Sequence, residues 1–182
     1  MTSEMFTQVG WAYGPQHLLK ALQSVHHNGV YACSTILQEA VAVGLEKEME
    51  RTADQSGYWK GLSSLLQKKR DYICGYLSSL GVTATVPQGS YFIVCDFSRI
   101  ASKLKLEATE PKHLQFSDWL HRTKKLKSFP GSSYFSNQQS PFAQYLVRFC
   151  FAKDDSTLRQ AAEILMELET ELKNATGRGS ST

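Results

Sequence analysis

The sequence has no long apolar run and no closely spaced pair of cysteines. Residues 1–9 carry no apolar core of the kind that a secretory signal peptide needs, and no stretch is long and apolar enough to span a bilayer. The four cysteines lie far apart, which argues against a zinc ribbon or a redox pair; they are Cys33, Cys74, Cys95 and Cys150. These absences predict a reducing compartment, which we expect to be the cytoplasm, or a mitochondrion if a longer precursor exists.

The chain also lacks a strong excess of charge of one sign. Its 182 residues include 20 Lys and Arg against 17 Asp and Glu, and a hydrophobic content of 42% is enough for a sizeable core. The basic run at residues 124–127 has no aromatic platform around it, so we interpret it as a solvated helix end and predict no nucleic-acid partner. His26 and His27 are adjacent and cannot both face one metal from a helix, so no metal site is predicted. We expect His113 and His121 to lie at the surface.

Hydrophobic spacing predicts a mixed α/β fold. Gly81 is expected to end the third helix, and the polar residues 174–182 are expected to form a disordered tail. Helices are expected at about residues 16–27, 34–50, 58–80, 113–124 and 157–172, and strands at about residues 9–13, 91–96, 127–129 and 145–151.

Arg148 interrupts the most apolar of these strands, whose sequence at residues 145–151 is Tyr-Leu-Val-Arg-Phe-Cys-Phe. Side chains alternate along a strand, so Arg148 shares a face with Leu146 and Cys150. A guanidinium keeps its proton and offers a planar fork of donors, which predicts a planar anion such as a carboxylate as its partner. The pattern leaves open a ligand carboxylate or an internal salt bridge, for example with Asp96. Just after the strand, Asp154 or Asp155 is expected to cap the last helix.

Three segments resemble the class I aminotransferases of fold type I, and most of all the kynurenine aminotransferase (cysteine-conjugate β-lyase) branch. They are Gly-Trp-Ala-Tyr-Gly-Pro-Gln-His-Leu at residues 10–18, Pro-Gln-Gly-Ser-Tyr-Phe-Ile-Val at 87–94, and Val-Arg-Phe-Cys-Phe-Ala-Lys-Asp-Asp-Ser-Thr-Leu at 147–158. The likeness is collinear from Gly10 to about Leu168. It implies pyridoxal phosphate as cofactor, amino-acid and 2-oxo-acid substrates, a homodimer, and Arg148 as the residue that binds the substrate α-carboxylate.

The resemblance also implies a division of the chain. Residues 1–57 are similar to the end of the large cofactor-binding domain, and residues 58–81 to the helix that joins the two domains. Residues 82–173 are similar to the small C-terminal domain, so the predicted fold is that small α/β domain with the C-terminal remnant of the large one.

Tyr31 lies where related enzymes place an aromatic residue that reaches the active site of the neighbouring subunit. The resemblance makes Tyr31 a candidate cofactor-side residue, while a packing tyrosine next to a helix is a slightly stronger interpretation. Many relatives carry histidine where Ala32 stands. The loop at residues 129–135 and the turn at Gly89-Ser90 resemble segments near the family's substrate, although ordinary turn chemistry explains both equally well.

The family's Schiff-base lysine has no counterpart in this sequence, because it would fall just before Met1. No catalytic residue is therefore assigned. Two hypotheses remain: the chain is part of a pyridoxal-phosphate transaminase that moves an amino group from a kynurenine- or glutamine-class amino acid to a 2-oxo acid, or it is a catalytically incompetent truncated product that acts at most as a dimerisation partner. Without the lysine, neither the internal aldimine nor the proton shift is available to the chain alone.

Overall fold

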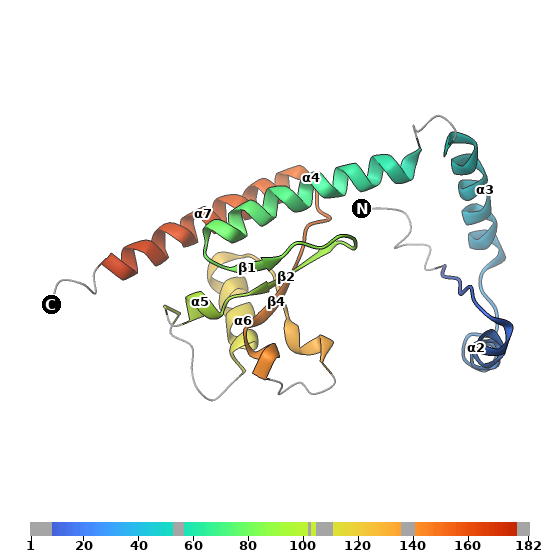
Figure 1. The fold of residues 1–182 in the computed structure, drawn as a ribbon, viewed down its shortest axis with the longest axis horizontal. Helices are drawn as coiled ribbons and strands as arrows, with labels where there is room; N and C mark the ends of the chain where they lie inside the picture. The colour runs from blue at the N-terminus through green and yellow to red at the C-terminus, as the bar shows by residue number, and fades with distance from the viewer. Residues whose placement is uncertain (1–8, 53–56, 102, 105–110, 136–140, 178–182) are drawn as a thin grey trace. The chain divides into compact units, whose positions relative to one another are not determined.

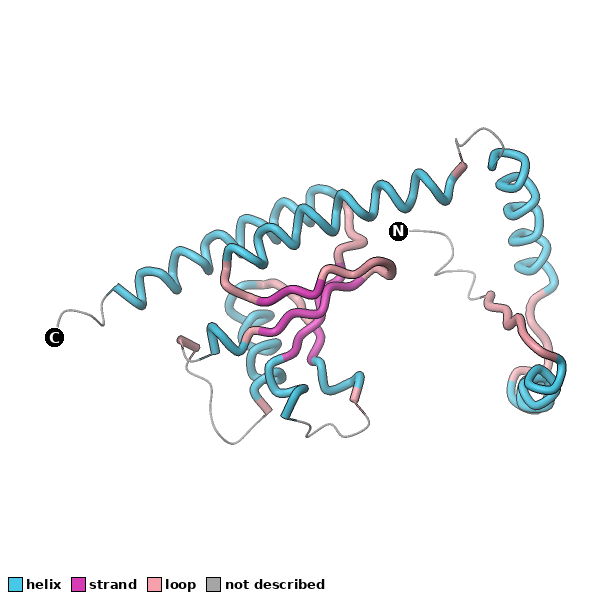
Figure 2. The backbone as a smooth tube through the Cα atoms, viewed as in Figure 1, coloured by secondary structure: helices cyan, strands magenta, loops and turns pink. Residues whose placement is uncertain are grey.

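A computed structural model describes residues 9–52, 57–101, 103–104, 111–135 and 141–177. These residues form two units, residues 1–62 and residues 63–182, which are described separately. Figure 1 shows the elements in chain order, and Figure 2 shows the same backbone coloured by secondary structure. Among the described residues, no helix combines the length and the apolar character needed to cross a bilayer.

The first unit is helical. It contains α2 (Gln16–Gly29), α3 (Thr35–Thr52) and the first turn of α4 (Tyr58–Ser79). Glu48 of α3 is buried, and its Oε1 accepts the backbone N–H of Trp59 at 3.2 Å. A carboxylate is favourable beside the unpaired N–H groups at a helix start. Gly57 permits this approach, because a Cβ there would lie 2.5 Å from the same oxygen.

The second unit is built on a four-stranded antiparallel sheet in the order β1-β2-β4-β3. The strands are β1 (Thr83–Thr85), β2 (Phe92–Asp96), β3 (Phe129–Pro130) and β4 (Leu146–Cys150). Two long helices, α4 and α7 (Asp155–Gly177), run side by side along the sheet (Figure 1), and α6 (Lys112–Lys124) packs into the same core. Short helical turns complete the unit: α5 (Ser98–Ala101), η1 (Gly131–Tyr134) and η2 (Pro141–Tyr145).

One core joins the sheet to the three helices of the second unit. Ile93 and Cys95 of β2 and Val147 of β4 are fully buried, and they pack with apolar residues of the helices; these are Ile73 and Leu77 of α4, Phe116 and Leu120 of α6, and Leu158, Leu165 and Leu168 of α7. Burying apolar surface of this kind supplies most of the driving force for folding. The predicted α/β class is confirmed.

The element boundaries follow the sequence pattern with three differences. Residues 9–13 form no strand, the three-residue strand β1 was not expected, and α7 continues to Gly177 instead of ending near residue 172. The remainder of the expected tail lies outside the described residues. Gly81 does end α4: its φ is 83°, and the N–H of Val82 donates to Leu77 O at 3.2 Å, which is the pattern of a left-handed helix end.

The turn between β4 and α7 is fixed by hydrogen bonds at Asp154, which is one of the two residues expected to cap the helix. Its Oδ1 accepts the N–H of Thr157 at 2.8 Å, and its Oδ2 accepts the hydroxyl of the same residue at 2.8 Å. Hydrogen bonds from Ser156 and Thr157 hold the pKa of Asp154 well below its usual range. Lys69 of α4 joins this turn, donating to Lys153 O at 2.6 Å and lying 3.1 Å from Asp155.

His113 is buried, with 1% of its surface exposed, so the expectation of a surface position is wrong. It lies on the face of α6 that also carries Phe116 and Leu120, three and seven residues on, and this face enters the core. Neither ring nitrogen has a hydrogen-bond partner in the described part of the chain, although the backbone of Gln144 lies close enough to favour the charged form. Burial outweighs that effect and lowers the pKa of His113. His121 is exposed, as expected.

We expect His113→Leu to stabilise the second unit and to flatten its stability profile at acid pH. Because the folded-state pKa lies below the ordinary value of 6.5, the unfolded chain binds more protons below that pH, and the wild-type protein loses stability as the pH falls. Removing two unpaired buried nitrogens is expected to add about 1 kcal/mol. Urea unfolding at several pH values below and above 6.5 measures both effects, with His121→Leu as the exposed control. Parallel profiles for wild type and His113→Leu would contradict this prediction.

Candidate functional site

Arg148 lies at the centre of β4, between two neighbouring strands. In the sheet register it is opposite Val94 of β2 on one side and opposite Phe129 of β3 on the other. Val147 and Phe149, its neighbours in sequence, are buried in the core, whereas Arg148 is half-buried on the opposite face with Leu146 and Cys150. The alternation predicted from the sequence is thus observed, and the guanidinium lies on the sheet face away from the core.

Three aromatic rings surround the guanidinium. Its Cζ lies 3.9 Å from the ring centroid of Phe92, 4.9 Å from that of Phe129 and 5.0 Å from that of Tyr134. All three distances are within the range of cation–π attraction. We refer to Phe92, Phe129 and Tyr134 as the aromatic box.

The backbone places each ring of the aromatic box. Phe92 precedes Val94 by two residues and therefore shares its face, while Phe129 is directly opposite Arg148. Tyr134 ends η1, which begins at Gly131. A Cβ at Gly131 would lie 2.6 Å from the Cβ of Leu146 and 2.7 Å from its carbonyl oxygen, so only glycine lets η1 approach β4 this closely. The expected Pro-Gly turn is thus also a close backbone contact.

The guanidinium has no ion-pair partner among the described residues. Its Nε is buried and has no hydrogen-bond partner there. Asp96, the internal partner considered from the sequence, uses its Oδ1 to accept the N–H of Ser98 at 2.8 Å at the start of α5. The internal salt bridge to Asp96 is not formed, and the charge of Arg148 is not neutralised by it.

Tyr31 belongs to the first unit and follows α2 in a left-handed conformation, with φ of 67°. Its side chain is 79% exposed; its N–H donates to His26 O at 3.0 Å, and its ring lies 5.7 Å from that of His27. Within the described residues of this unit, its ring contact is therefore with His27, and most of the ring surface is exposed. A non-glycine residue with positive φ is uncommon and is worth a functional test.

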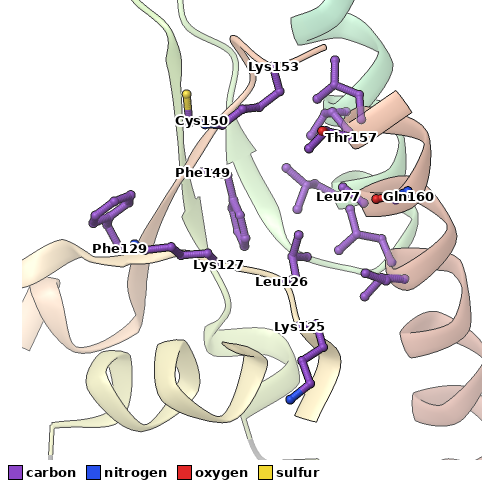
Figure 3. Close-up of a pocket in the computed structure, with 15 residues that line it drawn as sticks. Leu77, Lys125, Leu126, Lys127, Phe129, Phe149, Cys150, Lys153, Thr157 and Gln160 are labelled. Carbon is purple, nitrogen blue, oxygen red and sulfur yellow. The ribbon is translucent and has the colours of Figure 1, made fainter. Parts of the chain in front are cut away.

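A cavity of about 360 Å³ lies between β4, α4 and α7, and Phe129 of the aromatic box is among the residues that line it. Its walls are mainly apolar, with Phe149 and Leu77 among them, and Lys125 and Lys153 lie at opposite ends (Figure 3). Arg148 does not line it. No group of three or more potential metal ligands occurs within the ranges that the structure describes.

Residues 7–165 match the family of class I and II aminotransferases, and the chain belongs to that family. It is 39% identical over 158 residues to kynurenine–oxoglutarate transaminase 3 of Mus musculus, a match that covers 86% of this chain and 35% of the relative. It is 35% identical over 168 residues to kynurenine–oxoglutarate transaminase 1 of Homo sapiens, covering 91% and 40%. The structure of N-succinyldiaminopimelate aminotransferase from Mycobacterium tuberculosis is similar in fold, with a TM-score of 0.73, 24% identity, and coverage of 91% of this chain and 38% of that one.

These matches confirm the resemblance seen in the sequence, and the chain spans between a third and two fifths of the length of these curated relatives. The family uses pyridoxal phosphate. The residues described do not by themselves fit this cofactor, since a phosphate requires several converging donors and, among these residues, the contacts found for Tyr31 are with His26 and His27. No reaction step is therefore derived through the cofactor.

We expect the 182-residue chain alone to show no saturable binding of pyridoxal phosphate. The physical reason is that a single exposed tyrosine supplies neither a Schiff-base amine nor a phosphate-binding set of N–H groups. Equilibrium dialysis measures the bound fraction, with borohydride reduction and mass spectrometry to detect a lysine adduct. Retention of one cofactor per chain, lost in Tyr31→Ala but kept in Tyr13→Ala, would overturn the prediction and place a cofactor contact at Tyr31.

Proposed function

We propose that this chain provides the substrate-carboxylate-binding part of a pyridoxal-phosphate-dependent transaminase. In this proposal, Arg148 binds the α-carboxylate of an amino acid of the kynurenine or glutamine class, and the reaction transfers the amino group to a 2-oxo acid. The observation that carries the proposal is a half-buried guanidinium, surrounded by three aromatic rings, with a buried Nε that lacks a hydrogen-bond partner and with no ion-pair partner among the described residues. Relatives named kynurenine–oxoglutarate transaminases support the substrate class.

The planar guanidinium suits a carboxylate better than an anion that binds without a fixed orientation. Arginine and carboxylate form two parallel charge-assisted hydrogen bonds, which fix the plane and direction of the ligand as well as its position. Fixing the carboxylate also limits the orientation of the α-carbon bonded to it, which is the contribution that Arg148 makes to reactivity. Arg148 itself transfers no proton, because its guanidinium stays protonated.

The surroundings of Arg148 favour an amino acid with an apolar portion. Phe129 is 40% exposed and Tyr134 is 53% exposed, so both rings offer surface to a ligand held at the guanidinium. Val94, opposite Arg148 in the register, adds a partly exposed apolar side chain on the same face. A kynurenine-type side chain is able to bury apolar area against such surfaces.

Two further assignments belong to the same proposal. A homodimer is proposed from the family, and Tyr31 is proposed to contact the cofactor side of the neighbouring subunit. The exposure of Tyr31 and its unusual backbone conformation support this assignment.

The test removes the guanidinium and measures carboxylate binding. We expect L-kynurenine to shift the side-chain ¹⁵N–¹H signals of Arg148 in NMR spectra of the chain, and kynurenine amide, which lacks the carboxylate, to leave them unchanged. Arg148→Gln is expected to weaken kynurenine binding about 10- to 100-fold, as a charge-assisted pair is worth about 1.5–3 kcal/mol. Arg148→Lys keeps the charge but loses the planar fork of donors, so its affinity for kynurenine is expected to lie between those of wild type and Arg148→Gln.

Arg99→Gln is the matched control, because it removes an exposed arginine from the same unit. Equal affinity of wild type and Arg148→Gln for kynurenine, or equal binding of the amide, would sink the proposal.

A further inference from the structure

The rings of the aromatic box come from three separate segments of the second unit. Phe92 begins β2, Phe129 begins β3, and Tyr134 ends η1. The sheet register and the close contact at Gly131 bring them to one guanidinium. The Cζ of Arg148 lies 3.9, 4.9 and 5.0 Å from the three ring centroids, so rings from three segments lie against this cation.

We propose that Phe92, Phe129 and Tyr134 are positioning residues that hold the guanidinium of Arg148 with its two Nη atoms directed to the ligand. This proposal rests on the proposed function, because it concerns how the same arginine meets the carboxylate. The rings touch the guanidinium and act on the ligand's affinity through it, in addition to the apolar surface that Phe129 and Tyr134 offer to the ligand directly.

The aromatic box stabilises the charge of Arg148 in place of a carboxylate of the same chain. A buried arginine is ordinarily paired with a carboxylate of its own chain, which would leave little charge for a ligand. Aromatic faces attract the cation through their quadrupole but accept few of its hydrogen bonds. The aromatic box therefore stabilises the guanidinium while its hydrogen-bonding capacity and its charge remain available.

The burial of Nε determines which edge of the guanidinium is open to a ligand. The Nε is buried without a partner among the described residues, so the side of the fork that contains Nε is closed to a ligand. The two Nη atoms form the remaining pair of donors, and a carboxylate approaches them end-on. An arginine without flanking rings would sample other rotamers. Each binding event would then include the entropic penalty of ordering its side chain.

The surroundings of the guanidinium also favour one kind of ligand. An end-on approach between ring faces suits a planar carboxylate whose attached carbon carries apolar substituents. Lys127 extends the positive surroundings, since its Nζ lies 5.4 Å from the ring centroid of Phe129. The site is therefore expected to prefer an aryl- or alkyl-bearing carboxylate to a free inorganic phosphate.

Paired substitutions separate the ring from the rest of each side chain. Tyr134→Phe and Phe129→Tyr keep a ring, whereas Tyr134→Leu and Phe129→Leu remove it but keep apolar bulk. Both positions are partly exposed, so the leucine variants are expected to fold. The unrelated exposed ring of Tyr72, changed to leucine, controls for the loss of an aromatic side chain elsewhere in the unit.

The first measurement is the Nε–Hε signal of Arg148 in the NMR spectrum of the 182-residue chain without ligand. We expect a ring-shifted signal protected from solvent exchange in wild type, Tyr134→Phe, Phe129→Tyr and Tyr72→Leu. In Tyr134→Leu and Phe129→Leu we expect exchange to increase and the ring shift to shrink. Unchanged protection and shift in both leucine variants would overturn the proposal, as would an equal loss in Tyr134→Phe.

The second measurement is the dissociation constant for L-kynurenine. Each leucine variant is expected to bind about 2- to 5-fold more weakly, and each ring-retaining variant is expected to restore wild-type affinity. If Arg148→Gln loses binding while both leucine variants bind like wild type, the aromatic box is not a positioning device and the proposed function stands. If Arg148→Gln binds like wild type, the proposed function fails, and the exchange data on the free chain decide separately whether the rings order the guanidinium.

Discussion

The register of β4 between β2 and β3 is the constraint on which the Arg148 site depends. Side chains alternate along a strand, so a slip of one residue would turn Arg148 into the core and Val147 out of it. The observed register places Val147 among fully buried residues and Arg148 opposite Val94 and Phe129. Burying an unpaired guanidinium is far more costly than burying a valine, so the core itself enforces the direction of the arginine.

Contacts outside the sheet hold that register in place. Lys69 ties α4 to the end of β4 through Lys153 and Asp155, and Gly131 allows η1 to press against Leu146 at its start. Asp154 then begins α7, whose apolar face covers the core side of the sheet. The two ends of β4 are therefore fixed by different partners, and Arg148 lies between them. An element predicted as an interdomain helix, α4, is in this unit also a wall of the core, through Ile73 and Leu77.

Part of this structure could be predicted from local features of the sequence. The face of Arg148, the cap at Asp154 and the end of α4 at Gly81 follow from alternation, side-chain chemistry and the freedom of glycine. The aromatic box did not follow, because its members are 42 residues apart at the extremes of 92 and 134, and only the strand register brings them together. Tyr134 also sits in a short helical turn with no period of its own.

The surface position expected for His113 was wrong for a different reason, because the sequence does contain a pattern that indicates its burial. With Phe116 and Leu120 it forms one stripe of α6 at helical spacing, and that spacing indicates a buried position in spite of the polar side chain. The assignment of Arg148 to a ligand carboxylate came from the family resemblance, since the strand pattern alone was equally compatible with Asp96. The structure removes that particular alternative, because Asp96 caps α5.

In the proposed site, the aromatic box would resolve a conflict between stability and binding. A carboxylate from the chain itself would stabilise Arg148 more strongly than rings do, but it would then compete with any ligand carboxylate for the same donors. Cation–π contacts are weaker and occupy the faces of the guanidinium, whereas hydrogen bonds use its edge. Since faces and edge do not compete, the protein is able to order the cation in advance and still leave the outward donors free. The unpartnered Nε carries a desolvation penalty, and we interpret this penalty as a consequence of keeping the charge of Arg148 available to a ligand.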